Sequence, residues 1–129
     1  MGETEFTDRE LDVMSILWRE GSGTVGEVRE RLEDELAYTT VLWVLQTLEA
    51  KGYVRHESEG RAYRYYPTVA ADEAGRTAIG RIVEKVFHGS AAMLFSQLVE
   101  EREIPAEELE RMRELLERRL GEGDAEAGK

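Results

Sequence analysis

Residues 39–66 of the chain have the sequence TTVLWVLQTLEAKGYVRHESEGRAYRYY. As far as Gly52, apolar side chains recur at every third or fourth position, which is the spacing of an amphipathic helix. From Tyr53 onward the period shifts toward two, and Glu59-Gly60 is a dipeptide suited to a tight turn. This stretch predicts a helix that ends at Gly52 and is followed by a two-stranded hairpin, which Pro67 closes.

The predicted helix begins at Thr39 or Thr40, either of which can cap it, and it has two unlike faces. One face is an apolar stripe that we expect to be buried, formed by Val41, Val44, Leu45 and Leu48. The other face is polar and aromatic and almost free of charge, formed by Thr39, Thr40, Trp43, Gln46 and Thr47. The helix is therefore expected to bury the first face and to present the second.

The predicted hairpin must lean on the helices, because an isolated hairpin is only marginally stable in water. Tyr63 and Tyr65 share the strand face that is suited to this contact. Arg64 then lies on the opposite face, and Arg61 lies at the tip of the turn.

Two capping boxes mark the starts of two earlier helices. Thr7 with Glu10 opens the first helix, and Thr24 with Glu27 opens a second, shorter one. The resulting order of helix, helix, helix, strand, strand is that of a winged helix-turn-helix. We therefore predict a mainly α fold with a small β-hairpin, in which residues 1–67 form a winged-helix domain.

After Pro67 the chain is expected to be helical, over about residues 72–88, 90–101 and 105–120. Two of these helices carry apolar side chains that so small a region cannot readily bury, namely Ile79, Ile82, Val83, Val86, Leu109, Met112 and Leu116. These side chains form either an intramolecular core or a symmetric dimer interface, and we favour the dimer. Residues 68–120 are thus a predicted helical dimerisation region, and the Gly- and Glu-rich residues 121–129 are a predicted disordered tail.

Charge is unevenly distributed along the 129 residues, whose net charge is −11. Residues 1–35 contain 11 acidic and 4 basic side chains, and residues 68–129 contain 14 and 9. Residues 36–67, by contrast, contain 3 acidic and 4 basic side chains, so their net charge is +1. Because phosphate attraction needs a positive field, only this segment is not repelled by a nucleic acid.

These patterns favour DNA binding, with the third helix in the major groove and the hairpin along the backbone. The predicted contacts are Thr39, Thr40, Trp43, Gln46, Thr47, Arg55, Arg61 and Arg64. Gln46 and Thr47 can read base edges and the arginines can bind phosphates, whereas Trp43 either contacts a base or sugar or packs on the hairpin or a neighbour. The alternative is a winged helix that binds a protein partner and no DNA.

The composition argues against several other classes of protein. With no cysteine, and with two histidines outside any metal-ligand spacing, the chain offers no thiolate nucleophile and no expected metal site. It has no glycine-rich phosphate loop and no spacing typical of a catalytic triad, so we expect neither an enzyme nor a cofactor. No apolar run is long enough to span a membrane and no signal peptide begins the chain, which favours the cytoplasm.

Four segments combine into a fairly specific pattern. They are Thr7-Asp8-Arg9-Glu10-Leu11-Asp12-Val13-Met14 with Leu17-Trp18, Ala37-Tyr38-Thr39-Thr40-Val41 with Leu45 and Leu48, Lys51-Gly52, and Arg61-Ala62-Tyr63-Arg64-Tyr65-Tyr66-Pro67. Together, over about residues 6–120, they resemble the penicillinase-repressor family of bacterial transcriptional regulators, the BlaI/MecI/CopY group.

The resemblance implies a homodimer with an N-terminal winged helix and a C-terminal three-helix dimerisation region. Such a repressor binds palindromic operators whose half-sites are similar to TACA and TGTA. The family's DNA contacts correspond here to Thr39, Thr40, Trp43, Thr47, Arg61 and Arg64. Well-known members have basic residues on the reading helix, where this chain has Leu42 and Thr47.

The resemblance also bears on how repression is relieved. Antibiotic-responsive members are inactivated when a membrane metalloprotease sensor triggers cleavage between Asn and Phe in the dimerisation region. The corresponding bond here is Gln97-Leu98, so the resemblance implies a protease partner acting at that position. Copper-responsive members bind metal through a C-terminal Cys-x-Cys pattern, which a chain without cysteine cannot form.

Overall fold

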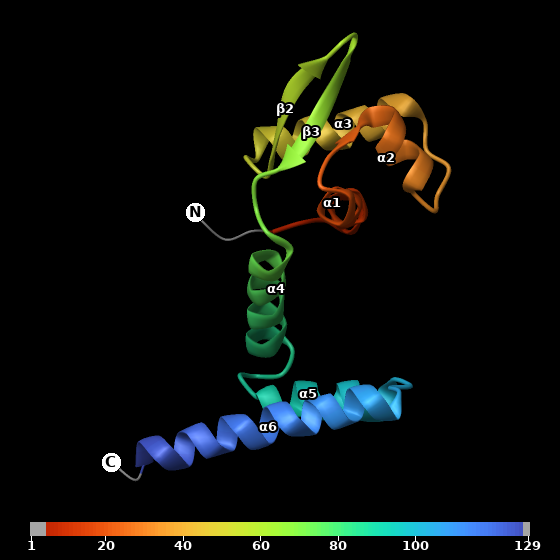
Figure 1. Ribbon diagram of the computed structural model, residues 1–129. Helices are drawn as coiled ribbons and strands as arrows, with labels where there is room; N and C mark the ends of the chain where they lie inside the picture. Colours follow the sequence, from red (N-terminus) through yellow and green to blue (C-terminus); the bar gives the residue numbers. More distant parts are fainter. Residues whose placement is uncertain (1–4, 128–129) are drawn as a thin grey trace. The chain divides into compact units, whose positions relative to one another are not determined.

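The computed structural model describes residues 5–127, with side chains described as far as Gly123. In chain order the described elements are α1 (Asp8–Glu20), β1 (Gly23–Thr24), α2 (Val25–Arg31), α3 (Tyr38–Ala50), β2 (Val54–Glu59), β3 (Ala62–Pro67), α4 (Ala71–Lys85), α5 (Ala91–Glu101) and α6 (Ala106–Ala127) (Figure 1). They form two compact units, one through Ile82 and the other from Val83. The mainly α fold with a small sheet confirms the predicted fold class, and the first unit extends past Pro67 into α4.

The first capping box ties α1 to the end of α3. Thr7 Oγ1 accepts a hydrogen bond from the Glu10 amide at 3.1 Å, and Glu10 Oε1 accepts one from the Thr7 amide at 2.9 Å, as predicted. The same carboxylate binds Lys51 Nζ at 2.8 Å, although Glu10 is only 5% exposed. Burial alone would raise the pKa of Glu10, but hydrogen bonds from Lys51 and Thr7 outweigh it and hold the pKa below its usual value.

The sheet has a third strand that the sequence analysis did not foresee. Gly23 and Thr24 form β1, which pairs antiparallel with β3 so that Gly23 lies opposite Tyr65 and Thr24 lies opposite Arg64. The strand order is β1-β3-β2. A strand of two residues, the second of which is the N-cap of α2, carries no period of its own, so only the tertiary structure shows that these residues pair.

The start of α3 differs from the prediction. The carbonyl of Ala37 accepts hydrogen bonds from the amides of Thr40 and Val41, so Ala37 is the N-cap and the helix begins at Tyr38. Neither Thr39 nor Thr40 caps the helix, since no side chain caps this end. The predicted stop is confirmed: Gly52 has a φ of 86°, in the left-handed region that suits glycine at a helix end.

The hairpin agrees with the prediction except at its turn. Glu59 lies opposite Ala62, so the connecting residues are Gly60 and Arg61, and the turn is displaced by one residue from the predicted Glu59-Gly60. Gly60 has a φ of 63°, the backbone conformation that favours glycine in such a turn. The displacement places Arg61 at the tip, as predicted.

The core of the first unit lies between the three helices and the sheet. Its buried side chains are Val13, Met14, Ile16, Leu17, Val25, Val28, Val41, Val44, Leu45, Leu48, Val54 and Tyr65. The predicted stripe of α3 is therefore buried in full. Only one of the two tyrosines expected to lean on the helices is buried, because Tyr63 is 50% exposed and its ring lies 4.3 Å from that of His56.

The C-terminal helices follow the predicted boundaries closely, with one correction. Residues 121–127 continue α6 as helix and are not the predicted disordered segment, while residues 128–129 lie outside the described residues. Extending an existing helix costs far less than starting one, and Arg119 with Glu122 adds an ion pair at this end. Within the described residues, no helix combines the length and apolar character needed to cross a bilayer.

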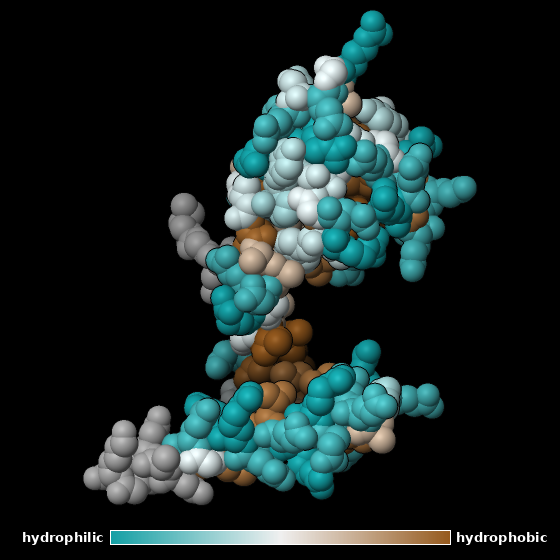
Figure 2. Space-filling view, viewed as in Figure 1, coloured by the Kyte–Doolittle hydropathy of each residue, from teal (hydrophilic) through white to brown (hydrophobic). Residues whose placement is uncertain are grey.

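Among the described side chains of the second unit, none is buried. Figure 2 shows apolar atoms at the surface of the C-terminal helices, whereas the visible face of the first unit is mostly hydrophilic. The two units therefore differ in how much of their apolar surface they cover by themselves.

Glu10→Gln keeps a side-chain acceptor for the Thr7 amide and removes the charge that pairs with Lys51. We expect it to destabilise the first unit by about 1–2 kcal/mol near neutral pH. Because folding lowers the pKa of Glu10, this contribution is present above the unfolded-state pKa of about 4.3 and is lost as the pH falls through the lower folded-state value. Urea titrations followed by the fluorescence of Trp18 and Trp43, both in the first unit, measure the difference.

The matched control is Asp12→Asn, because the pair that Asp12 makes with Arg9 is exposed. It should change the free energy of unfolding by less than about 0.5 kcal/mol. A difference between Glu10→Gln and wild type that is as large at about pH 3 as near neutral pH would contradict the assignment.

Candidate nucleic-acid interface

The face of α3 opposite the core is exposed and uncharged. Trp43 is 65% exposed, the most of any side chain in the first unit that is both large and apolar. Thr39, Thr40 and Gln46 are exposed around it, and Thr47 is half-buried. The structure thus brings together the five residues of α3 that the sequence predicts as DNA contacts. Trp43 does not pack into the core, so its exposed indole is free to meet a ligand.

The hydroxyl of Thr47 already donates a hydrogen bond within α3. Its Oγ1 donates a hydrogen bond to the carbonyl of Trp43, one turn earlier, at 2.9 Å. A hydroxyl has a single proton to donate, so Thr47 can only accept a further hydrogen bond or offer its methyl group. An uncharged face with this methyl group and an indole suits apolar contact with the methyl group of thymine.

Tyr38 is a further candidate that the sequence analysis did not single out. It is the first residue of α3 and is 48% exposed. Placing the start of the helix at Thr39 or Thr40 left Tyr38 outside it. The extended conformation of Ala37 before a helical run is the feature that assigns Tyr38 to the reading helix.

Most cations of residues 36–67 are paired with carboxylates. Lys51 pairs with Glu10, Arg55 with Glu57 at 2.6 Å, and Arg64 with both Glu27 and Glu59. Arg55 also stacks over the ring of Tyr66, with its guanidinium carbon 4.4 Å from the ring centre.

Arg61, at the tip of the hairpin, is exposed and forms no ion pair within residues 5–123. In Figure 1 the hairpin rises beside α3, and its tip points away from the helices of the first unit. Arg61 is therefore the wing cation most readily available to a phosphate.

Arg64 does not lie on a free face. The sequence places it on the strand face opposite Tyr63 and Tyr65, but Ser22, Glu27 and Glu59 surround it there, and the Arg64 side chain is only 19% exposed. The hydrogen bonds that Arg64 donates to Glu59 and Glu27 raise the pKa of Arg64, and they hold the pKa values of both carboxyl groups below their usual range. Its predicted role as a phosphate contact thus meets competition from two carboxylates.

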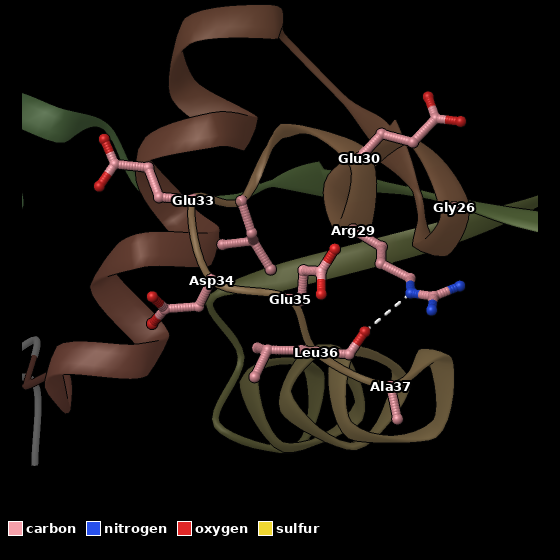
Figure 3. A pocket seen from close by; sticks show the side chains of 9 residues that line it. Gly26, Arg29, Glu30, Glu33, Asp34, Glu35, Leu36 and Ala37 are labelled. Atoms are coloured by element: carbon pink, nitrogen blue, oxygen red, sulfur yellow. Dashed lines mark hydrogen bonds between the residues drawn. The ribbon is translucent and has the colours of Figure 1, made fainter.

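The turn between α2 and α3 is strongly acidic. A shallow pocket of about 720 Å³ is lined there by Gly26, Arg29, Glu30, Leu32, Glu33, Asp34, Glu35, Leu36 and Ala37 (Figure 3). Arg29 Nε donates to the carbonyl of Leu36 at 2.7 Å, while the side chains of Glu30 and Glu33 extend away from one another. Among the described side chains, no three His, Asp or Glu gather closely enough to hold a metal ion. These carboxylates repel phosphate beside the first turn of α3 and narrow the surface that DNA can approach.

The predicted dimerisation residues are largely exposed. Ile79, Ile82 and Val86 on or just after α4, and Leu109 and Leu116 on α6, are between 40% and 60% exposed. Val83 and Met112 are half-buried. On α5, Gln97 and Leu98 are both exposed.

Comparisons with known proteins agree with this geometry. A family model described as penicillinase repressor matches residues 6–118. The penicillinase repressor of Bacillus licheniformis is 24% identical over 115 residues, which cover 88% of this chain and 90% of that protein. The transcriptional regulator BlaI of Mycobacterium tuberculosis is 44% identical over 73 residues, which cover 54% of this chain and 53% of that protein. The solution structure of the DNA-binding domain of the repressor BlaI aligns with a TM-score of 0.50 at 29% identity, covering 55% of this chain and 89% of that domain.

Proposed function

Because the chain belongs to the penicillinase repressor family, whose members are transcriptional repressors rather than enzymes, we propose that it represses transcription by binding operator DNA. One observation carries the proposal: the uncharged, exposed face of α3 lies beside a hairpin whose tip presents Arg61, which has no ion pair among the described side chains. A major-groove helix needs such a face to approach bases, and a wing needs a cation to meet the backbone.

The residues of α3 take different parts in this proposal. Thr39 and Thr40, in the first turn, are suited to phosphate oxygens, because the amides at a helix N-terminus also point that way. Gln46 is suited to adenine, and Thr47 to the methyl group of thymine. Trp43 adds apolar contact with a thymine methyl group or a sugar.

The phosphate contacts of one protomer are few. Arg61 supplies the principal contact. Arg55 is stacked on Tyr66 and paired with Glu57, so it supplies at most a weaker contact. An acidic chain with so few cationic contacts gains affinity by engaging two half-sites at once, because linked binding events raise the effective concentration of the second. We therefore propose a homodimer on a palindromic operator.

Arg61→Ala should weaken binding to all DNA sequences and lower the slope of log K against log salt by about 2 for the dimer, since one phosphate contact is lost from each protomer. Trp43→Ala should instead reduce the preference for operator over unrelated DNA and leave the slope unchanged. Fluorescence anisotropy with a duplex from the chain's own upstream region, titrated at several salt concentrations, measures both quantities.

The matched control is Arg76→Ala on α4, an exposed cation away from the wing. Wild-type protein that shows no salt-dependent, sequence-selective binding would reject DNA binding. The remaining alternative would be a winged helix that binds a protein partner, and Arg61→Ala should then leave partner binding unchanged.

The homodimer is supported by the apolar side chains of the second unit, which that unit leaves uncovered. Apolar side chains on α6 recur three or four residues apart, as in a helix face that packs on another helix, at Leu109, Met112, Leu116 and Leu120. Closed twofold pairing would cover this face in both copies at once.

Met112→Glu places a carboxylate in the proposed interface and should weaken dimerisation more than tenfold, or by more than about 1.4 kcal/mol. Leu116→Glu, at a more exposed position of the same face, should act in the same way. Arg118→Glu, on the opposite face of α6, is the control and should leave the dimer intact. Sedimentation velocity over a range of concentrations distinguishes these cases, and a dimer that survives both interface variants would remove α6 from the interface.

We further propose that a membrane metalloprotease sensor relieves repression by cleavage of the Gln97-Leu98 bond. A protease needs extended backbone, and α5 has no buried residue, so its local unfolding costs little. Cleavage there would separate α6 from the DNA-binding unit and so dissolve the dimer.

Mass spectrometry of the repressor isolated from cells challenged with a penicillin should detect a fragment that ends at Gln97 and one that begins at Leu98. Gln97→Pro, which changes the residue on the amino side of the bond, should resist cleavage and keep the target genes repressed. Recovery of intact repressor from cells in which those genes are induced would contradict this route of relief.

A further inference from the structure

Arg64 is enclosed by groups from three parts of the first unit. Its Nε and Nη2 donate to the two carboxylate oxygens of Glu59 at 2.8 and 2.9 Å, next to the turn of the wing. Its Nη1 and Nη2 donate to the two oxygens of Glu27 on α2, both at 2.9 Å. Nη1 also donates to Ser22 Oγ at 3.2 Å, in the segment that precedes β1.

These contacts use every donor that the side chain has. A guanidinium carries five N–H groups, in a planar fork. The structure pairs Arg64 through five hydrogen bonds, two to each carboxylate and one to the hydroxyl of Ser22. A phosphate oxygen could bind Arg64 only by displacing one of these partners.

The same conclusion follows from the net charge of this cluster, which consists of Ser22, Glu27, Glu59 and Arg64. One guanidinium lies between two carboxylates, so the cluster carries a net negative charge and does not attract a phosphate. A cation that is held bidentately by two carboxylates loses much of its ability to bind a third anion.

The cluster mechanically joins the wing to α2. Glu27 Oε1 also accepts a hydrogen bond from the amide of Thr24 at 3.3 Å, so the acceptor that caps α2 also binds Arg64. Thr24 itself lies opposite Arg64 in the pairing of β1 with β3. The connection therefore runs from Glu59, beside the tip, through Arg64 to the start of α2.

We propose that Arg64 is a positioning residue: it sets the orientation of the wing against α2, and thereby the place of Arg61, without contacting DNA. The proposal rests on the proposed function for its effect on DNA binding, but the position of the wing can be measured without DNA. It assigns Glu59, an acidic residue on a DNA-binding wing, the role of holding that wing in place.

The first test uses the free protein and hydrogen exchange followed by mass spectrometry. Arg64→Gln and Glu59→Gln should both raise the exchange rates of the amides in β1, β2 and β3 by about threefold or more, because the wing opens locally more often. Glu57→Gln is the matched control, since it removes the same charge from the same strand but its partner is Arg55. Wing exchange in Arg64→Gln and Glu59→Gln that equals wild type would overturn the proposal, whatever the protein does with DNA.

The second test measures DNA affinity, for which the loss of a charge and the loss of wing support predict changes of opposite sign. Removing a carboxylate near DNA should strengthen binding by charge alone, and Glu57→Gln should do so or have no effect. Glu59→Gln should instead weaken binding by about threefold or more, because the wing loses its support. In an Arg64→Gln background, Glu59→Gln should have little further effect, since the contact it breaks is already absent.

The salt dependence separates positioning from phosphate contact. Arg64→Gln should leave the slope of log K against log salt at the wild-type value, while Arg61→Ala lowers it by about 2 for the dimer. A slope lowered by about 2 in Arg64→Gln would mean that Arg64 binds phosphate, and tighter binding by Glu59→Gln would mean that the wing does not need this support. Either result would overturn the proposal. If wild-type protein binds no DNA at all, the proposed function fails, and the exchange rates still decide the role of Arg64.

Discussion

A helix in a small domain can bury one face only, and this constraint on α3 determines the rest of the first unit. Val41, Val44, Leu45 and Leu48 are all buried, and at about 1.5–3 kcal/mol each they hold the helix firmly against α1, α2 and the sheet. The opposite face is then exposed by geometry. Trp43 is exposed because the helix is held by its other side, and the wing is placed beside it because Tyr65 is buried in the same core.

Charge constrains the interface as strongly as shape does. The net charge of +1 over residues 36–67 suggests a basic surface, but the fold pairs two of the four cations, Lys51 and Arg64, with carboxylates from other elements. Lys51 is held by Glu10 and Arg64 by Glu27, each of which also accepts a hydrogen bond in a capping box. These two glutamates thus stabilise the fold and at the same time neutralise the charges of Lys51 and Arg64. Recognition must then depend on apolar and hydrogen-bonding contacts more than on phosphate attraction.

The two units also differ in what they require from a partner. The first unit has a continuous core of its own. The described side chains of the second unit are all at least partly exposed, so it reaches a buried state only in contact with something else. Under the proposed function, DNA affinity would be coupled to assembly, since each protomer alone would have few phosphate contacts.

Local patterns in the sequence were sufficient to predict most helices and strands of this protein. The features that predict them are both capping boxes, the buried stripe of α3, the glycine stop at Gly52 and the hairpin. Each of these depends on residues within a few positions of one another. They also identified the exposed face of α3, because a helical period determines both faces together. The strand β1, the start of α3 at Tyr38 and the partners of the wing arginines were decided only by the tertiary structure. Glu27 and Arg64 are 37 positions apart, and no period or motif relates them. Side chains so distant in sequence meet only when the core has brought α2 and the wing together, and that meeting leaves Arg61 as the available cation on the wing.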